Sequence, residues 1–246
     1  MTFRAFLAAA PLLLVTACSG GDVANETAPA NSVKATAAPA GKAWVDTVVK
    51  TPDGGFRMGN PDAPLKVVEY GSRACPYCAL FDTEGFEPLK ANYIATGKVS
   101  YEFREYPVHG PLDFAPILLG QCTGDTATFF PILDQMFKNQ ETLLKNEPAT
   151  AATVQAMTNA TPNQVAVAFA EGLGYIDFMK QRGLPEDKAR ACLNDPAGIK
   201  KIVDGAQAAN DKFQVSGTPT FILNDVKLDG VMSWEKLKEV LTQRGA

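Results

Sequence analysis

The chain has 246 residues, of which 46% are hydrophobic, with a formal net charge of −4, one histidine and five cysteines. This composition is that of a soluble globular protein, and its slight acidic excess provides no basic surface for nucleic acid. A single histidine excludes a metal site built from several imidazoles, and five cysteines are too few for a disulfide-dense small scaffold, so the core must come from apolar packing.

Residues 1–17 have the pattern of an export signal. Arg4 precedes an apolar run that ends at Val15, which is too short to span a bilayer and matches the apolar part of a signal peptide, about 7–15 residues long. The ending Leu-Val-Thr-Ala-Cys at 14–18 resembles a bacterial lipobox, which predicts cleavage before Cys18 and a lipid on its sulfur. The alternative is a plain secretory signal with an incidental cysteine.

The segment 18–43 is built from Ala, Pro, Thr, Asn, Ser and Gly with almost no aliphatic bulk. Such a composition cannot bury enough apolar surface to fold, so we expect a flexible tether to a folded part that begins near Trp44. These features predict a protein of the bacterial cell envelope that faces the periplasm and is anchored by the lipid on Cys18. That compartment is oxidising, so cysteine pairs in the folded part can form disulfides.

Residues 44–110 have the pattern of a strand, a helix and a second strand. The first strand is predicted at 65–70, where β-branched and apolar residues predominate, and the second at 99–104, where apolar and polar residues alternate. A helix is expected to begin at the sequence Cys-Pro-Tyr-Cys at 75–78, and Pro88 is expected to kink or break it. A strand, helix and strand with this spacing predict a parallel strand pair.

Residues 111–205 have helical composition, and Thr161-Pro-Asn-Gln164 is a capping box with proline at the first helical position. Helices are predicted at 112–122, 126–139, 150–159, 175–182, 186–193 and from Asp195 towards Phe213. Residues 206–246 return to strands and a closing helix, with Asn224-Asp225 as the hairpin turn and Ser233 as the helix cap. The predicted elements of this part are 215–223, 226–228 and 234–243. The layout predicts one α/β sheet in two halves that enclose a helical insertion.

The cysteines of the 75–78 motif predict redox chemistry. Two cysteines three residues apart at the start of a helix can bring their sulfurs within bonding distance. Cys75 would lie at the helix N-terminus, where free backbone N–H groups stabilise a thiolate, so we expect it to be the exposed nucleophile. Cys78, one turn later, is expected to be buried and to resolve the mixed disulfide. Pro76 fits the first helical position because it lacks an N–H group.

The motif C-x-x-C also serves as half of a zinc site, which needs three or four protein ligands. The remaining candidates are Cys122, Cys192 and His109, and none of them lies in a second C-x-x-C or an H-x₃₋₅-H pattern. We therefore expect no metal and no other cofactor. A C-x-x-C beside a strand-helix-strand pattern instead indicates a thioredoxin-like redox centre.

The motifs together resemble the DsbA family of thiol:disulfide oxidoreductases. The resemblance rests on Glu-Tyr-Gly-Ser at 69–72, the Cys-Pro-Tyr-Cys motif, the helical insertion and Val-Ser-Gly-Thr-Pro-Thr-Phe-Ile at 215–222, and it covers residues 60–243. It implies an α/β fold of the thioredoxin type with an inserted all-helical subdomain. It also implies an enzyme that exchanges disulfides with reduced or unfolded secreted proteins and is reoxidised by a quinone-linked membrane partner.

The same resemblance implies roles for further site residues. Pro219 falls on a cis-proline loop that faces the redox helix, and a cis bond before proline costs only about 0.5–1 kcal/mol. The backbone of Thr218 would then pair with an extended substrate segment, which Pro76 and Tyr77 would also contact. The alternative is a trans proline that begins an edge strand.

Glu69 falls on the position of a buried acid behind the redox pair, where a raised pKa would let it take and return the Cys78 proton. The alternative is a carboxylate at a solvated strand edge. Two residues depart from the pattern of the strongest oxidants: Tyr77 stands where a histidine would help hold the Cys75 thiolate, and Thr218 replaces a valine. Both departures predict a milder oxidant.

Cys122 and Cys192 both fall in the helical insertion, and in an oxidising compartment we expect them to form a structural disulfide. Such a bridge would close a loop of about 70 residues and contribute about 2–4 kcal/mol. The functional alternative is a bridge that tunes the redox pair or passes electrons to it. His109 is expected to be an ordinary loop histidine, with substrate contact or thiolate electrostatics as the alternative.

The expected function is the introduction of disulfides into secreted proteins by exchange through Cys75 and Cys78. Two alternatives remain. The first is a disulfide reductase of the same fold, which Tyr77 and Thr218 would suit. The second is a non-catalytic chaperone or binding module, including a thiol-dependent copper carrier. Residues 18–43 are too short and polar to form a dimerisation module, which disfavours an isomerase.

Overall fold

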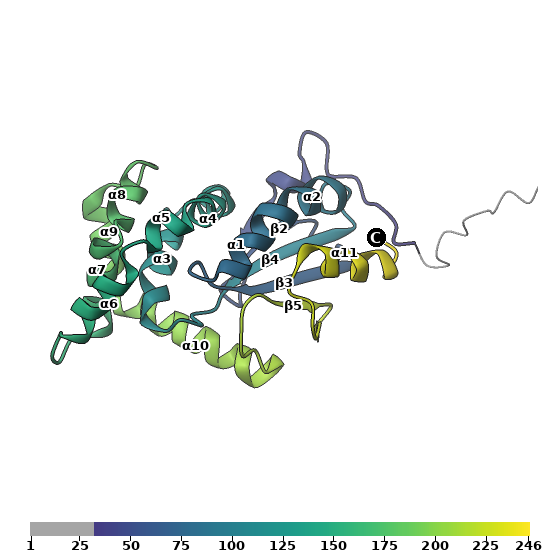
Figure 1. Cartoon of the computed structure of the whole chain (residues 1–246). Coiled ribbons are helices and arrows are strands. Elements are labelled where there is room, and N and C mark those ends of the chain that lie inside the picture. The colour runs from purple at the N-terminus through teal and green to yellow at the C-terminus, as the bar shows by residue number, and fades with distance from the viewer. Residues whose placement is uncertain (1–31) are drawn as a thin grey trace, which may run out of the picture. The chain divides into compact units, whose positions relative to one another are not determined.

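The computed structural model describes residues 32–246, so the predicted export signal and Cys18 lie outside the described residues. The described end of the expected tether, residues 32–43, lies against the folded part, where the backbone N–H groups of Val33 and Thr36 donate hydrogen bonds to the carbonyls of Gly245 and Thr96. The centre of the fold is a mixed sheet with the strand order β1-β2-β4-β3-β5-β6 (Figure 1). The strands are β1 (Val48–Lys50), β2 (Phe56–Gly59), β3 (Leu65–Gly71), β4 (Val99–Glu105), β5 (Thr220–Leu223) and β6 (Val226–Lys227).

The strands predicted at 65–70 and 99–104 are confirmed as β3 and β4 in the middle of this sheet, whereas the strand predicted at 215–223 begins only at Thr220 and the one at 226–228 forms the edge. β3 pairs in parallel with β4, as the strand-helix-strand pattern predicted, and antiparallel with β5 on its other side. The predicted turn Asn224-Asp225 is confirmed: both residues have positive φ and join β5 to β6. The pairing of β3 with β5 places the residues before Thr220 beside the end of β3, which brings the two predicted site segments together.

The hairpin of β1 and β2 was not predicted. Its strands are three and four residues long, which is too short for an alternating pattern to be recognised in the sequence. β2 pairs antiparallel with β4 and so adds this hairpin to the edge of the sheet. Gly54 has a φ of +84° in the hairpin turn, a conformation that favours glycine.

The helix after β3 continues to Ile94, as the apolar pattern of residues 89–94 predicts. It comprises α1 (Pro76–Phe81) and α2 (Glu87–Leu89), and wider π-helical turns at Asp82–Phe86 and Lys90–Ile94 follow each of them. We expected Pro88 to kink or break it, but the backbone stays in the right-handed helical region on both sides of this residue. The helix is therefore not broken at Pro88, and the π-helical turns that flank this residue are where the regular α-helical hydrogen bonding is interrupted.

The helical insertion begins at Pro111, where it was expected. Its helices are α3 (Pro111–Gln121), α4 (Phe129–Lys138), α5 (Gln140–Leu144), α6 (Glu147–Gln155), α7 (Pro162–Gly172), α8 (Tyr175–Lys180) and α9 (Glu186–Leu193). The capping box at Thr161 and Gln164 is confirmed, with both reciprocal hydrogen bonds present. These helices form a core of their own, and Figure 1 shows them gathered beyond one end of the sheet.

α10 (Pro196–Phe213) connects the insertion to the sheet. It is one continuous helix of 18 residues, so the domain boundary that we placed between residues 205 and 206 falls inside it. Its last turns pack on the sheet, where Ala209 lies in a small core with Tyr70 and Ile222. The same helix therefore belongs to both parts of the molecule.

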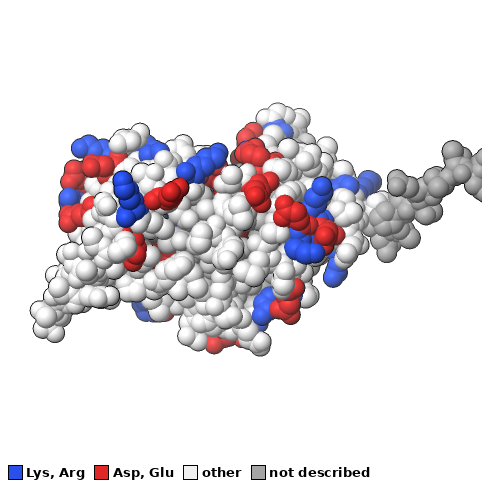
Figure 2. All heavy atoms as spheres, in the orientation of Figure 1, with Lys and Arg blue, Asp and Glu red and all other residues white. Residues whose placement is uncertain are grey.

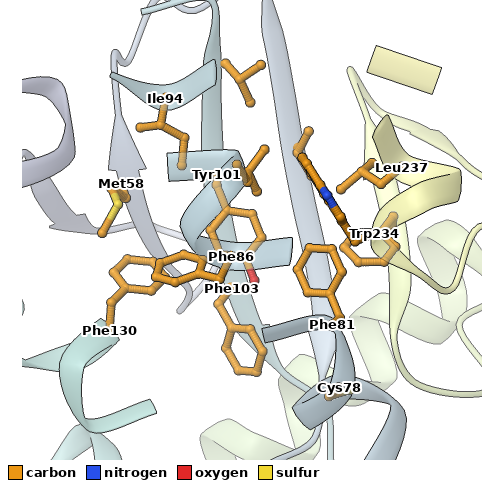
Figure 3. Packing of buried hydrophobic residues seen from close by; sticks show 14 of the residues in the cluster. Met58, Cys78, Phe81, Phe86, Ile94, Tyr101, Phe103, Phe130, Trp234 and Leu237 are labelled. Carbon is orange, nitrogen blue, oxygen red and sulfur yellow. The ribbon is translucent and has the colours of Figure 1, made fainter. Parts of the chain in front are cut away.

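The other face of the sheet carries the largest core. α1 and α11 (Trp234–Gln243) cover this face, and Ser233 caps α11 as predicted. Figure 3 shows the aromatic rings of Phe81, Phe86 and Tyr101 packed between the helices and the sheet. Among residues 32–246, no helix is long and apolar enough to cross a membrane.

Candidate active site

Cys75 lies where the chain leaves the sheet and enters α1. β3 ends at Gly71, and Ser72 then holds the turn, because its carbonyl accepts the Cys75 N–H (3.2 Å) and its hydroxyl accepts the Ala74 N–H (3.1 Å). Cys75 is the N-cap residue and Pro76 follows at the first helical position. The first N–H groups of a helix have no partner inside the helix, so they point to Cys75 and favour negative charge there.

A second segment closes over this helix start. The Thr218–Pro219 peptide bond is cis, and the Thr218 carbonyl accepts a hydrogen bond from Cys75 Sγ at 3.3 Å. The loop is brought here by β5, which begins at the next residue and pairs with β3. The structure thus places the two motifs of the sequence, 143 positions apart, in direct contact.

Both cysteines are free thiols, and both are buried. The expectation of an exposed Cys75 is wrong: the residue is 4% exposed, against 0% for Cys78. The loop with Thr218 contributes to this burial, since its carbonyl lies 3.3 Å from the Cys75 sulfur. The residue that does reach solvent is the neighbouring Tyr77, which is 59% exposed.

The two thiols have opposite pKa shifts. The pKa of Cys75 falls from 9.0 to about 5, chiefly because the Cys78 thiol donates a hydrogen bond to its thiolate, with help from the backbone N–H groups of Tyr77 and Cys78. The pKa of Cys78 is raised well above 9.0, first by burial and then by the hydrogen bond that it gives to Cys75. At neutral pH the pair therefore holds one thiolate, on Cys75, and one thiol.

Glu69 lies behind the pair and is buried, which decides between the two sequence alternatives. The residue is 1% exposed, and its Oε2 accepts a hydrogen bond of 2.6 Å from the Tyr101 hydroxyl, while Oε1 has no partner. Its pKa rises from 4.5 to about 8, mainly through burial, while the Tyr101 hydrogen bond opposes that rise. The Cys78 thiol is close enough to act on this pKa. Glu69 thus presents a protonated carboxyl oxygen beside Cys78 near neutral pH.

The remaining predicted residues separate into two groups. Pro76 and Tyr77 are exposed on the first turn of α1, beside the Cys75 sulfur. Cys122 and Cys192 form a disulfide with Cα atoms 6.0 Å apart, and they lie in the helical core rather than in the core that contains the redox pair.

Sequence reasoning missed a buried ion pair next to the motif. Arg73 is 1% exposed and binds Glu105 of β4, with Nη2 to Oε1 at 2.6 Å. Its guanidinium lies over the ring of Phe129 and against Gly120, where a Cβ atom would collide with it. Gln140 donates hydrogen bonds of 3.0 Å to the carbonyls of Arg73 and Cys75. These contacts fix the insertion to the turn that carries Cys75.

No local pattern reveals these contacts, since each joins distant segments of chain. The one sequence sign was a charged residue two positions before Cys75, between a strand and a helix. Within the described part of the chain, no group of three or more His, Cys, Asp or Glu side chains could hold a metal ion.

Two cysteines at a helix start, facing a cis-proline loop on a mixed sheet, define the class of thioredoxin-like redox proteins. The chain belongs to the thioredoxin family, whose sequence profile matches residues 51–243. Its fold is the thioredoxin-like fold with a helical insertion.

The similar proteins are protein-disulfide oxidoreductases. A solved protein-disulfide isomerase from Novosphingobium aromaticivorans is 29% identical with a TM-score of 0.73, over 79% of this chain and 99% of that one. The α-DsbA1 of Wolbachia pipientis is 23% identical with a TM-score of 0.57, over 77% and 89%, and shows the same fold. A protein named as a protein-disulfide oxidoreductase in Rickettsia bellii is 26% identical over 70% of this chain, which spans 58% of the relative's length.

Proposed function

We propose that the protein is a DsbA-type thiol:disulfide oxidoreductase that introduces disulfides into secreted proteins through Cys75 and Cys78. The observation that carries this proposal is the asymmetry of the pair: the pKa of Cys75 is lowered to about 5 while that of the buried Cys78 is raised. A thiolate is the form that attacks and leaves in disulfide exchange. The named relatives support the general class of activity.

The exchange begins from the Cys75–Cys78 disulfide. A substrate thiolate attacks Cys75 Sγ, the disulfide breaks, and Cys78 leaves and takes a proton from the neighbouring Glu69 carboxyl. A second substrate thiolate then attacks the substrate sulfur that is bound to Cys75, and Cys75 leaves as a thiolate. The substrate loses two electrons and two protons. The electrons reduce the cysteine pair, and one proton reaches Cys78 through Glu69 while the other goes to solvent.

The oxidising direction follows from which form of the pair is stabilised. A thiolate with a pKa near 5 stabilises the reduced pair at neutral pH, and a stabilised reduced pair accepts electrons from substrate. Tyr77 carries no charge that would lower the pKa of Cys75 further, so we expect a milder oxidant than a protein with histidine at that position.

The surface around the pair suits an extended, weakly charged polypeptide. Tyr77 and Leu80 of α1 are 59% and 48% exposed, so the helix that carries the cysteines presents two large apolar side chains to solvent. Figure 2 shows few charged side chains in the middle of this face, where α1 lies in Figure 1. The backbone of Thr218 beside Cys75 would pair with the substrate segment in the manner of an added strand.

We also propose that the protein works in the cell envelope, anchored through a lipid on Cys18, and that a quinone-linked membrane partner reoxidises it. The lipobox-like residues 14–18 and the polar segment 18–43 support the anchor. The family resemblance supports the partner. Radiolabelled fatty acid should enter the wild-type protein and should not enter Cys18→Ser.

The reduction potential of the Cys75–Cys78 pair, measured against glutathione on the mature protein, tests the direction. We expect a value between those of protein disulfide isomerase, about −180 mV, and DsbA, about −120 mV. A value near that of thioredoxin, about −270 mV, would overturn the oxidase and support the reductase of the same fold.

A further inference from the structure

A cluster of three polar residues lies beside the Cys75 turn and takes no part in the steps above. The buried Asp113, at the start of α3, accepts hydrogen bonds from the Ser72 hydroxyl (2.7 Å, Oδ1) and from the His109 backbone N–H (2.8 Å, Oδ2). The His109 ring nitrogen Nδ1 lies 3.2 Å from Ser72 Oγ and 3.4 Å from Asp113 Oδ2. Ser72 and Asp113 are both 0% exposed.

Hydrogen counting fixes the protonation of the imidazole. A serine hydroxyl has one hydrogen, and that of Ser72 is given to Asp113, so Ser72 Oγ can only accept from His109. Both neighbours of His109 Nδ1 are then acceptors, and Nδ1 must carry the hydrogen. The nitrogen that gains and loses a proton is therefore Nε2. The His109 side chain is 37% exposed, so this proton can exchange with solvent.

The same Ser72 connects this cluster to the redox cysteine. Its carbonyl accepts the Cys75 N–H and its hydroxyl accepts the Ala74 N–H, so one residue holds both the imidazole and the cysteine turn. The pKa of His109 is raised, first by its hydrogen bond to Asp113, while partial burial opposes the rise and the charges of Asp113 and Cys75 add to it. Cys75 is therefore within electrostatic reach of the imidazole.

We propose that His109 supplies the positive charge that Tyr77 does not: held by Asp113 and Ser72, its imidazolium stabilises the Cys75 thiolate and makes the pair a stronger oxidant. This inference rests on the proposed function and adds a positioning residue to it. His109 acts through Cys75 and has no part in breaking or forming the disulfide bonds.

The charged groups around His109 determine how its effect depends on pH. Asp113 contacts it from α3, and the charge of Cys75 at the start of α1 acts on it through space. Glu105 of β4 lies near Asp113 but is paired with Arg73. Protonation of the imidazole adds a positive charge near the Cys75 thiolate, so the stabilisation is complete below the pKa of His109 and is lost as the pH rises through it.

The chain has one histidine, so its imidazole can be followed by proton NMR without assignment. We expect the pKa of His109 to be higher in the reduced protein, where Cys75 is a thiolate, than in the disulfide form. The expected difference is roughly 0.5–1 pH unit, which corresponds to a unit charge several ångströms away in a partly solvated site. Equal values in the two redox states would overturn the proposal without any variant.

The reciprocal measurement uses the thiolate absorbance of the reduced protein against pH. His109→Gln should raise the pKa of Cys75 by the same amount, because coupling between two sites is mutual. The equilibrium constant for oxidising glutathione should fall roughly three- to tenfold at a pH where wild-type His109 is protonated. His109→Arg should retain the low pKa of Cys75. If His109→Arg raises this pKa as much as His109→Gln does, a charge effect is contradicted.

Lys212→Gln is the matched control, since it removes one exposed cation at the end of α10, where Lys212 pairs with Asp225 of the β5–β6 turn. It should leave both pKa values unchanged. The two proposals fail differently. If the pKa of His109 changes with the redox state but the protein oxidises no substrate, the proposed function fails and the interaction between His109 and Cys75 stands. If substrate is oxidised but the pKa of His109 is the same in both redox states, only the proposed interaction between His109 and Cys75 fails.

Discussion

Two pairs of cysteines occupy two different cores of this molecule. Cys75 and Cys78 are three residues apart at a helix start, with a carbonyl, free helix N–H groups and a buried carboxyl around them. Cys122 and Cys192 are 70 residues apart, already bonded, and packed with the aliphatic side chains of the helical insertion. Sulfur chemistry is the same in both pairs, so the neighbours make the difference.

The comparison shows what a reactive pair requires. A thiolate needs donors, which Cys75 has in the Cys78 thiol and the backbone N–H groups. In the proposed exchange the partner thiol needs a group that returns its proton, and Glu69, with a pKa raised to about 8, lies close to Cys78. Cys122 Sγ has one polar neighbour, the Lys188 carbonyl at 3.6 Å, and a carbonyl cannot stabilise a thiolate. The bridge in the insertion is therefore suited to hold structure.

The largest expected effect is the loss of disulfide exchange when the redox-active cysteine pair is altered. Cys75→Ser should abolish disulfide exchange while the protein stays folded, because the sulfur that the substrate attacks and that later leaves as a thiolate is gone. The measurement is the rate of oxidation of a reduced model peptide, with circular dichroism as the check on folding. Oxidation of the peptide by the Cys75→Ser variant would disprove the assignment of Cys75. A wild-type protein that binds unfolded polypeptide but exchanges no disulfide would favour the chaperone alternative.

The second largest effect is expected from breaking the buried ion pair of Arg73 with Glu105, which lies between the two cores. Arg73→Ala leaves the buried Glu105 without its partner and should cost about 3–5 kcal/mol in the free energy of unfolding. Urea denaturation measures this loss. Lys90→Ala, which removes an exposed pair with Glu87, is the control and should cost less than about 1 kcal/mol. Similar losses in the two variants would contradict a structural role for the buried pair.

Removal of the bridge in the insertion should reduce stability and leave the redox pair unchanged. The double variant Cys122→Ala, Cys192→Ala should unfold about 2–4 kcal/mol more easily, since the unfolded chain is no longer constrained by a long loop. For a domain of this size that lowers Tm by roughly 4–16 °C. The potential of Cys75–Cys78 should not move. A shifted potential would instead support a bridge that tunes the redox pair.

Glu69→Gln should have the smallest effect on stability and a clear pH dependence. Glu69 has a folded-state pKa of about 8, above its ordinary 4.5, so the folded protein binds the extra proton between these values. The stability of the wild type should therefore fall as the pH rises from 4.5 to 8. The variant should lack this decline. A decline of the same size in both proteins would show that Glu69 is not its source.

Local signals in the sequence predicted much of this site. Cys-Pro-Tyr-Cys, the residues around Pro219 and the turn at Asn224-Asp225 are short patterns whose conformation depends on neighbouring residues, and each has the expected structure. The capping box at Thr161 was found for the same reason.

Contacts between distant segments were not predictable in this way. The ion pair of Arg73 with Glu105 and the cluster of His109 with Ser72 each join residues more than 30 positions apart, and no periodicity marks them. Cys75 was expected to be exposed because the helix start is known from the motif, whereas the cover supplied by the loop at Thr218 depends on the tertiary fold.

The continuity of α10 has a mechanical consequence. The helix leaves the insertion, packs on the sheet, and passes through Gln214 directly into the loop that carries Pro219. The Tyr106 hydroxyl lies within hydrogen-bond distance of two acceptors, Asn210 Oδ1 on this helix at 2.8 Å and the Val215 carbonyl in the loop at 2.9 Å. At 1.5 Å per residue the helix acts as a lever of about 27 Å. We therefore expect a tilt of the insertion to move the loop over Cys75 together with this helix.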